Sequence, residues 1–243
     1  MMKIEGKKEK FLSFSSWDWP WLFHGFTTRW VVEKKEFINK GKSIKDIFKP
    51  FLQDIGCGTR KVVNAQQVHG DKVQFVEERE FYPKTDGLIT DKPKITLLAF
   101  FADCTPVFLV VPRKRIVGII HAGWKGTAQE ITKKSIKKLI EEKQVNPAEI
   151  RAGIGPTIGP CCYQVDIRVA RYFDCSSGLK PQKSGSFSLD LARANFKQME
   201  EAGVPPANIE RSGYCTSCNS HLFYSHRRDR GITGRMAGVI AIN

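Results

Sequence analysis

Two histidines and one cysteine lie at positions where an apolar strand gains nothing from a polar group. Cys104 interrupts the first apolar run of the stretch 97–130, His121 ends the second run, and His69 stands upstream in the segment Gln-Gln-Val-His-Gly. Neutral imidazole nitrogen and thiolate sulfur are common ligands of zinc and copper, and a catalytic zinc keeps three protein ligands and one open position. Although their spacing matches no local metal motif, we predict that the three residues meet in space, hold a metal and carry the catalysis.

The same three residues would also suit a nucleophilic site without a metal. A Cys104 thiolate within hydrogen-bond reach of His69 or His121 could attack a substrate, as in a Cys/His hydrolase. The residue types do not distinguish this interpretation from the metal site. Asp103 cannot share a strand face with Cys104, so we expect its carboxylate to orient a ligand or an arginine.

Most of the other cysteines fall late in the chain. The total of seven is odd, so at least one is unpaired, and a cytosolic protein keeps its thiols reduced by default. Cys215 and Cys218 form a C-x-x-C, but a strand rather than the helix of a redox pair is expected after it. We interpret Cys161, Cys162, Cys175 and this pair as buried or disulfide-linked thiols. A second metal site that combines Cys161 and Cys162 with the C-x-x-C pair is the open alternative.

Arginines and small hydroxyl residues predict an anion pocket. The segment 224–235 packs four arginines around glycines and small hydroxyl side chains. Guanidinium groups bind phosphate through paired hydrogen bonds, and glycine lets backbone amides approach the anion. No P-loop motif occurs in the chain. The residues that we expect to bind the anion are Thr28, Arg29, Lys125, Arg228 and Arg235.

Composition and charge narrow the classes of partner. The net charge of +14 favours anionic ligands, but no basic run is interleaved with aromatic residues, so nucleic acid is not favoured. The first ten residues are charged and lack the apolar core of a signal peptide, and the longest apolar stretch, 95–111, is too short and too interrupted for a membrane span. We therefore expect a cytoplasmic monomer or homodimer without a membrane partner.

The elements that must position these residues alternate in type along the chain. Apolar residues at helical spacing predict helices over 44–55, capped by Ser43, over 127–143, opened by a Thr127–Glu130 capping box, and over 166–173 and 191–202. We expect a frayed or edge element over 1–10 and no regular element in the aromatic run 17–26 before Phe23. Strands are predicted over 61–67, 73–76, 87–90, 95–101, 107–111, 116–121, 151–154, 208–212, 222–226 and 237–242.

Two of these strands lack polar alternation. The runs 97–101 and 116–120 are apolar at every position, which is typical of central strands covered on both faces. No repeat, linker or domain boundary is visible. We therefore predict a single α+β domain over 1–243, with a mixed β-sheet core and helices packed on it.

In order along the chain, these motifs resemble the laccase-domain proteins, a family long labelled polyphenol oxidases and now regarded as purine nucleoside phosphorylases. The resemblance runs from residue 24 to the last strand. Its segments are HGFTTR (24–29), QQVHGDKV (66–73), TDGLIT (85–90), ADCTPVFLV (102–110), HAGWKGT (121–127), GIGPTIGPCCYQV (153–165), CTSC (215–218) and SHRRDRGITGRMAGVI (225–240).

The resemblance implies a zinc bound by His69, Cys104 and His121, with copper as an alternative metal. It implies phosphorolysis of adenosine, inosine, guanosine and methylthioadenosine to the free base and ribose-1-phosphate, together with deamination of adenosine. We expect phosphate to bind near the arginines and to attack the ribose C1′. The sequence departs from the family at Lys125, where arginine is common, and at Gln164, where glutamate is common.

Two further interpretations come from other functional classes. A copper-dependent polyphenol oxidase (laccase) would need several clustered metals, and five histidines are few for such a centre. A non-catalytic nucleotide-binding protein would keep its ligand after the three metal-site residues were replaced.

Overall fold

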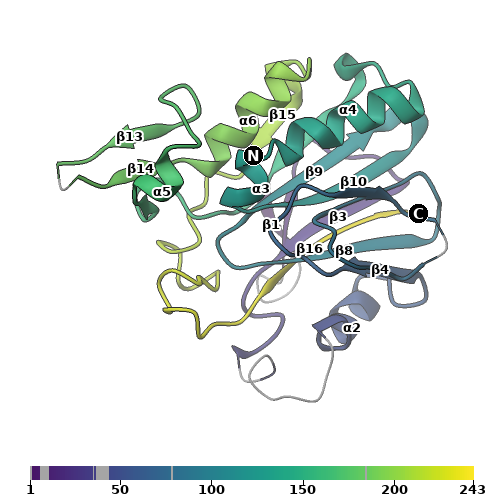
Figure 1. Cartoon of the computed structure of the whole chain (residues 1–243). Helices are drawn as coiled ribbons and strands as arrows, with labels where there is room; N and C mark the ends of the chain where they lie inside the picture. Colours follow the sequence, from purple (N-terminus) through teal and green to yellow (C-terminus); the bar gives the residue numbers. More distant parts are fainter. Residues whose placement is uncertain (1, 6–10, 35, 37–43, 78, 184) are drawn as a thin grey trace.

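The structure, a computed structural model, describes residues 2–5, 11–34, 36, 44–77, 79–183 and 185–243. Two large mixed sheets pack face to face at its centre (Figure 1). The first sheet has the order β1-β2-β3-β16-β8-β4-β6. Its strands are β1 (Met2–Glu5), β2 (Phe11–Phe14), β3 (Leu22–Thr27), β16 (Met236–Ile242), β8 (Ile95–Phe101), β4 (Lys61–Ala65) and β6 (Phe81–Tyr82).

The second large sheet has the order β15-β11-β9-β10-β7-β5. Its strands are β15 (Ile209–Arg211), β11 (Arg151–Ile154), β9 (Thr105–Val111), β10 (Ile116–Ala122), β7 (Gly87–Thr90) and β5 (Val73–Phe75). A small third sheet extends to one side (Figure 1) and consists of β12 (Gln164–Val165), β14 (Phe187–Leu189) and β13 (Leu179–Pro181).

Helices cover the outer faces of the two large sheets. Helix α2 (Ile44–Asp54) packs on the first sheet, while α4 (Ile131–Lys143) and α6 (Leu191–Glu201) cover the second (Figure 1). The shorter helices are α3 (Trp124–Ala128) and α5 (Ile167–Ala170), and the 3-10 turns are η1 (Pro112–Lys114), η2 (Pro147–Glu149) and η3 (Pro206–Asn208). The four layers therefore run from α2 through two sheets to α4 and α6.

Strand β8 explains why its apolar run does not alternate with polar residues. Leu97 and Phe101 point into the cluster between the two sheets, whereas Leu98 and Phe100 point into the cluster beneath α2. Both faces are thus removed from water, and each buried leucine or phenylalanine contributes about 1.5–3 kcal/mol of transfer free energy. The prediction of a central strand covered on both faces is confirmed.

The predicted class, α+β with mixed sheets and helices packed on them, is confirmed, but the strands divide between two large sheets. The predicted strand over 222–226 is wrong. Leu222, Phe223 and Tyr224 are buried, as in the central strands, but the segment belongs to none of the described strands. Side chains take the place of a strand partner there: the Met236 sulfur accepts from the Tyr224 amide, and Arg228 donates to the Phe223 carbonyl.

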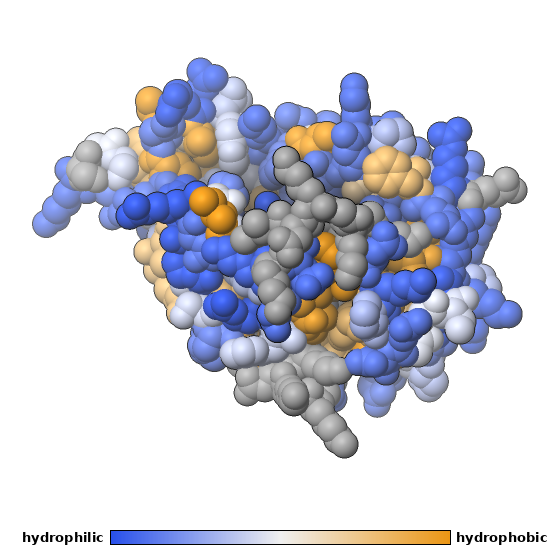
Figure 2. Space-filling model, turned by 90° about the horizontal axis from the view of Figure 1, so that it is seen from below, coloured by the Kyte–Doolittle hydropathy of each residue, from blue (hydrophilic) through white to orange (hydrophobic). Residues whose placement is uncertain are grey.

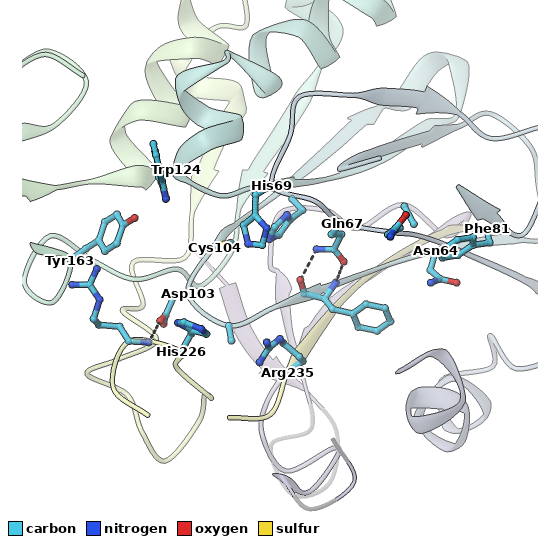
Figure 3. A pocket seen from close by; sticks show the side chains of 16 residues that line it. Asn64, Gln67, His69, Phe81, Asp103, Cys104, Trp124, Tyr163, His226 and Arg235 are labelled. Carbon is cyan, nitrogen blue, oxygen red and sulfur yellow. Dashed lines mark hydrogen bonds between the residues drawn. The ribbon is translucent and has the colours of Figure 1, made fainter. Parts of the chain in front are cut away.

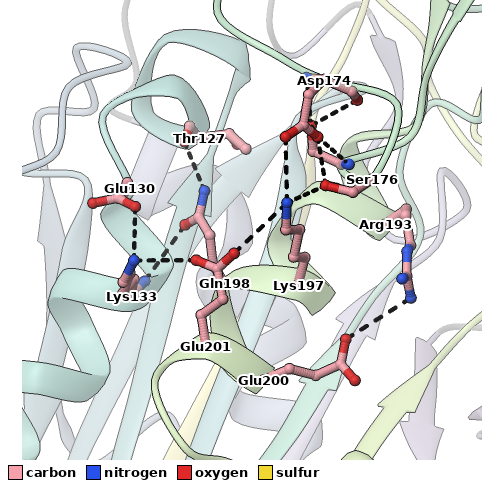
Figure 4. A network of polar contacts seen from close by, with 11 residues as sticks. Thr127, Glu130, Lys133, Asp174, Ser176, Arg193, Lys197, Gln198, Glu200 and Glu201 are labelled. Carbon is pink, nitrogen blue, oxygen red and sulfur yellow. Dashed lines mark hydrogen bonds and ion pairs between the residues drawn. The ribbon is translucent and has the colours of Figure 1, made fainter.

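The predicted capping box is also wrong. A separate helix, α3, starts earlier, and α4 begins after Glu130, which has a left-handed φ of 60° and no capping side-chain bond. Two side chains of helix α6 bind the polar groups of Thr127 instead. Asn195 donates a hydrogen bond to its hydroxyl at 3.1 Å, and Gln198 donates one to its carbonyl at 2.7 Å. Figure 4 shows this network, in which Lys133 also bridges Glu130 and an acidic residue of α6.

Two N-terminal predictions agree with the structure. Strand β1, which pairs with β2, is the edge strand of the first sheet, as expected for this segment, and β3 begins at Leu22, one residue before the Phe23 at which a regular element was expected. Strand β16 lies between β3 and β8 and pairs with both. Ser43, the predicted cap of α2, lies outside the described residues.

One face of the molecule is largely hydrophilic. Hydrophilic side chains dominate the face seen from below, and apolar side chains gather there only in smaller areas (Figure 2). None of the described helices is both long and apolar enough to cross a membrane.

Two connections carry the chain from one large sheet to the other at the same end. Residues 66–72 lead from β4 to β5, and residues 102–104 lead from β8 to β9. Strand β10 ends beside the second connection, because His121 pairs with Pro106 and Ala122 with Thr105. The candidate site lies where these three segments meet.

Candidate metal centre

His69, Cys104 and His121 come together as the sequence predicted. One ligand atom from each side chain lies within 4.8 Å of the other two. The two crossing connections supply His69 and Cys104, and β10 supplies His121. His69 is exposed, Cys104 is half-buried and His121 is buried, so the group faces solvent on one side (Figure 3).

Asp86 fixes both histidines. Its buried carboxylate lies 2.8 Å from Nδ1 of His121 and accepts hydrogen bonds from the backbone amides of Val68, His69 and Gly70 at 2.9–3.1 Å. A carboxylate on one ring nitrogen sets the tautomer of a histidine and leaves the other nitrogen for a metal. The same carboxylate of Asp86 therefore orients the His121 ring and holds the loop that carries His69.

Glycine at position 123 lets the backbone lie close to two of the three side chains. A Cβ atom added at Gly123 would lie 3.0 Å from Cδ2 of His69 and 3.1 Å from Sγ of Cys104, so a larger residue would crowd both. Gln67 braces the same loop, because its amide both donates to and accepts from the Phe100 backbone at 2.8 Å. His69 itself has a φ of 61°, a left-handed conformation that these contacts must hold.

Charge coupling favours the ionised forms of both Cys104 and His121. Burial opposes ionisation of the Cys104 thiol, but His121 and His69 outweigh it and lower its pKa to about 6. Burial likewise disfavours the charged His121 ring, yet Cys104 and Asp86 raise its pKa to about 9. Each group thus favours the charged form of the other, and a metal bound here would displace the His121 proton, because a ligating imidazole is neutral.

Asp103 contacts an arginine, one of the two partners expected for it, but at the backbone amide of that residue. Its carboxylate accepts from the hydroxyls of Thr216 at 2.6 Å and Ser225 at 3.0 Å, and from the backbone amide of Arg227 at 2.7 Å. Its carbonyl accepts from Thr157 and Ile158. Asp103 thereby anchors two distant loops beside Cys104, and its hydrogen bonds go to neither a metal ligand nor a guanidinium group.

A cleft of about 910 Å³ opens directly above the three ligands (Figure 3). Aromatic side chains line its walls, with Trp124 and Tyr163 on one side and Phe81 on the other, and Phe100 also lines it. The remaining lining residues are mostly polar and include Asn64, Gln66, His226, Arg227 and Arg235. The volume and the mixture of rings with hydrogen-bonding groups suit a small aromatic molecule that also carries polar groups.

Of the five residues predicted to bind an anion, Arg235 lines this cleft. Thr28 is buried, Arg29 donates to the Ser220 carbonyl and packs over Tyr224, and the Lys125 ammonium lies over Trp124. Arg228 uses all five guanidinium N–H groups on Asp229 and on the carbonyls of Thr216, Ser217 and Phe223. It supports a loop and keeps no donor for an anion.

Asp86, Gln67 and Arg227 are the residues that sequence reasoning missed. Asp86 lies in the turn Thr-Asp-Gly before a buried strand, a position that gave no sign of its distant partner His121. Arg227 lies in the arginine-rich segment, but alternation gave no way to tell which of its arginines faces the cleft. Its backbone bond to Asp103 directs it there, where its guanidinium group lies over the Tyr163 ring and donates to the Gln164 carbonyl.

Comparison with known proteins identifies relatives over most of the chain. A family model described as multi-copper polyphenol oxidoreductase laccase matches residues 39–243. Purine nucleoside phosphorylase YlmD from Geobacillus stearothermophilus is 41% identical over 197 residues, which cover 73% of this chain and 71% of that protein. Purine nucleoside phosphorylase YlmD from Bacillus subtilis is 37% identical over 227 residues, covering 87% and 77%. The crystal structure of the Geobacillus protein has a TM-score of 0.90 at 32% identity and covers 99% of this chain and 98% of that one.

Proposed function

The chain belongs to the multi-copper polyphenol oxidoreductase laccase family, and on that premise we propose that it is a zinc-dependent purine nucleoside phosphorylase. The observation that carries the proposal is a three-ligand site at the floor of a cleft with aromatic walls and two arginines. The names of its relatives, which describe purine nucleoside phosphorylases, support the same reaction. The substrates would be adenosine, inosine, guanosine and methylthioadenosine.

The donor set fits zinc. Imidazole nitrogen and thiolate sulfur are both zinc ligands, a catalytic zinc keeps three protein ligands, and the three donor atoms lie within 4.8 Å of one another. When bound, zinc at His69, Cys104 and His121 would act as a Lewis acid with one position open to the cleft. The same donors bind copper, so copper is the alternative metal.

The cleft residues would bind the two substrates. Trp124 and Tyr163 offer ring faces for the purine, since stacking on aromatic side chains accepts any purine without base-specific hydrogen bonds. Arg227 and Arg235 offer guanidinium groups for phosphate. Burial lowers the pKa of Arg235, against the raising effect of Cys104 and Asp103, but an arginine stays charged at neutral pH.

The reaction would be a substitution at the ribose C1′. A phosphate oxygen forms a bond to C1′ while the bond from C1′ to the purine nitrogen breaks, and the base leaves with a proton. Binding both substrates side by side converts a two-body reaction into a one-body reaction, and the arginines stabilise charge on the phosphate. Positioning by the cleft would supply most of the rate enhancement.

Deamination of adenosine is a second activity that the same site would support. Its overall reaction replaces the amino group at C6 of the purine with oxygen from water and releases ammonia. The observation in its favour is the exposure of His69 and Cys104 to the cleft, which gives a purine access to the ligand group. Polyphenol oxidation fits less well, because His24 is buried and accepts a hydrogen bond from the Phe14 amide rather than joining a metal group.

The proposal is tested with purified full-length protein, assayed with each nucleoside in the presence and absence of phosphate. We expect phosphate-dependent release of base and ribose-1-phosphate, and phosphate-independent conversion of adenosine to inosine. Activity should disappear on chelation and return with zinc. Undiminished activity after complete metal removal would favour a metal-free Cys/His hydrolase, and binding without turnover would favour a nucleotide-binding protein.

The arginines provide a matched pair for the same assay. Arg235→Gln should raise the KM for phosphate by roughly tenfold, because a guanidinium hydrogen bond to a charged partner contributes about 1.5 kcal/mol or more. Arg228→Gln should instead lower the melting temperature, because it breaks the contacts that hold the loop 216–229 together. An unchanged phosphate KM in Arg235→Gln would remove this residue from the phosphate site.

A further inference from the structure

Four cysteines form a second cluster of potential metal ligands, separate from the cleft. The sulfurs of Cys161, Cys162, Cys215 and Cys218 all lie within 4.8 Å of one another, and Cys218 lies 3.5 Å from Cys161 and 3.4 Å from Cys162. The first two residues follow β11, and the other two follow β15. We propose that this cluster is a structural zinc site with four thiolate ligands.

The spacing of the sulfurs fits a metal better than disulfides. Zinc–sulfur bonds of about 2.3 Å in a tetrahedron put neighbouring sulfurs about 3.8 Å apart, whereas a disulfide needs about 2.05 Å. Both short contacts involve Cys218, which is nearly equidistant from two partners. A disulfide would pull Cys218 toward one of them, whereas a central cation would hold all four.

The local backbone turns all four side chains to one point. The amides of Cys162 and Tyr163 both donate to the Gly159 carbonyl, and this tight turn lets the adjacent Cys161 and Cys162 contribute together. Cys215 and Cys218 have the C-x-x-C spacing of zinc-binding turns. The Gly159 amide donates to the Cys215 sulfur at 3.2 Å, as is typical of backbone support for a metal-bound thiolate.

The cluster joins the two loops that form one wall of the cleft. Thr216, between the paired cysteines, donates to the Asp103 carboxylate at 2.6 Å, and its carbonyl and that of Ser217 accept from Arg228. Tyr163, directly after Cys162, lines the cleft. Zinc binding, which releases the four thiol protons to solvent, would therefore cross-link the wall that carries Tyr163 and Arg227.

This second site does not depend on the proposed activity, so its test is the metal content of the full-length protein purified under reducing, anaerobic conditions. We expect about two zinc ions per chain in the wild type, about one in Cys104→Ala and about one in the double variant Cys161→Ser/Cys218→Ser. The double variant should also melt about 5 °C lower or more. Cys175→Ser is the matched control, because Cys175 is a free, exposed cysteine outside the cluster; it should keep both metals and the wild-type melting temperature.

If the double variant does not fold, the four-cysteine cluster can still be tested in a protein that keeps all four cysteines. Cobalt-loaded Cys104→Ala should retain the intense charge-transfer absorption and tetrahedral visible bands of a four-thiolate centre. A wild type with about one zinc ion, all of it lost in Cys104→Ala, would overturn the proposal. So would an intact mass showing that the four cysteines form disulfides, each lighter by two hydrogens, in protein isolated without reductant.

Discussion

The two sulfur-containing groups differ in donor type, in the number of potential ligands and in their position relative to the cleft. The group of His69, Cys104 and His121 has three ligands, opens into a cleft and lies at the ends of packed sheets. The four-cysteine group has only sulfur donors and lies on two loops, with Cys161 and Cys218 exposed. The first group also has the buried carboxylate of Asp86 behind it, whereas a backbone amide supports the second.

The net charge of zinc with each ligand set explains how the same metal could be reactive in one group and structural in the other. A zinc ion with two neutral imidazoles and one thiolate keeps a net charge of about +1 and remains an electrophile. With four thiolates the net charge is about −2, and the coordination shell is closed. We therefore expect reactivity at the first group and mechanical support at the second.

The largest expected effect separates the groups by activity. Cys104→Ala should lower kcat/KM for phosphorolysis by roughly 1000-fold, equivalent to about 4 kcal/mol of transition-state stabilisation. Cys218→Ser should keep kcat/KM within about tenfold of the wild type and lower the melting temperature instead. Steady-state kinetics and thermal unfolding of both variants, with Cys175→Ser as the control, measure the loss of activity and the loss of stability separately. Equal losses of activity in the two variants would show that the two groups do not divide into a reactive and a structural one.

The next effect concerns a buried histidine outside both groups, which serves as a reference without metal. Burial lowers the pKa of His24 to about 4, and its Nε2 accepts from the Phe14 amide, so the ring is neutral in the folded protein. An unfolded chain binds this proton near pH 6.5, so the contribution of His24 is complete above that pH and is lost as the pH falls toward 4.

We therefore expect the free energy of unfolding to fall by about 3 kcal/mol more in the wild type than in His24→Gln between pH 6.5 and 4. Denaturant titrations at several pH values measure the difference. It should persist in protein that lacks both metals, since His24 belongs to neither group. Parallel pH profiles for the two proteins would show that His24 is not the titrating residue.

A smaller effect tests the carboxylate behind the reactive group. Asp86→Asn keeps the shape but removes the charge that orients His121 and an acceptor for the amides of the His69 loop, so zinc affinity should fall about 10- to 100-fold. Competition with a chelator of known affinity measures the change. Asp91→Asn, at an exposed ion pair with Lys143, is the control and should bind zinc as the wild type does. An unchanged affinity in Asp86→Asn would limit Asp86 to loop structure.

Much of the site was predictable because its residues conflict with their local surroundings. His69, Cys104 and His121 interrupt or end apolar segments, and that conflict is visible without knowledge of the fold. The central strands were predictable for a related reason, since an apolar run without alternation fits a strand covered on both faces.

What escaped prediction depends on contacts between distant segments. Arg228 and Arg235 look equivalent in the sequence, yet the guanidinium group of Arg228 is bound to carbonyls about a dozen residues earlier in the chain, whereas Arg235 lines the cleft. Thr127 and Glu130 have the spacing of a capping box, but Thr127 accepts hydrogen bonds from side chains of α6 instead. The pairing of Asp86 with His121 likewise follows from the meeting of two sheets, which no local pattern encodes.

The central place of β16 has a consequence for how the protein is made. Strands β3 and β8 emerge from the ribosome early, but the strand that joins them is synthesised last of the three. Until it arrives, both strands present unpaired backbone groups and apolar faces, the condition in which nascent chains aggregate or recruit chaperones. We expect slow folding governed by this long-range closure, and a cellular yield more sensitive to substitutions in β16 than its few residues would suggest.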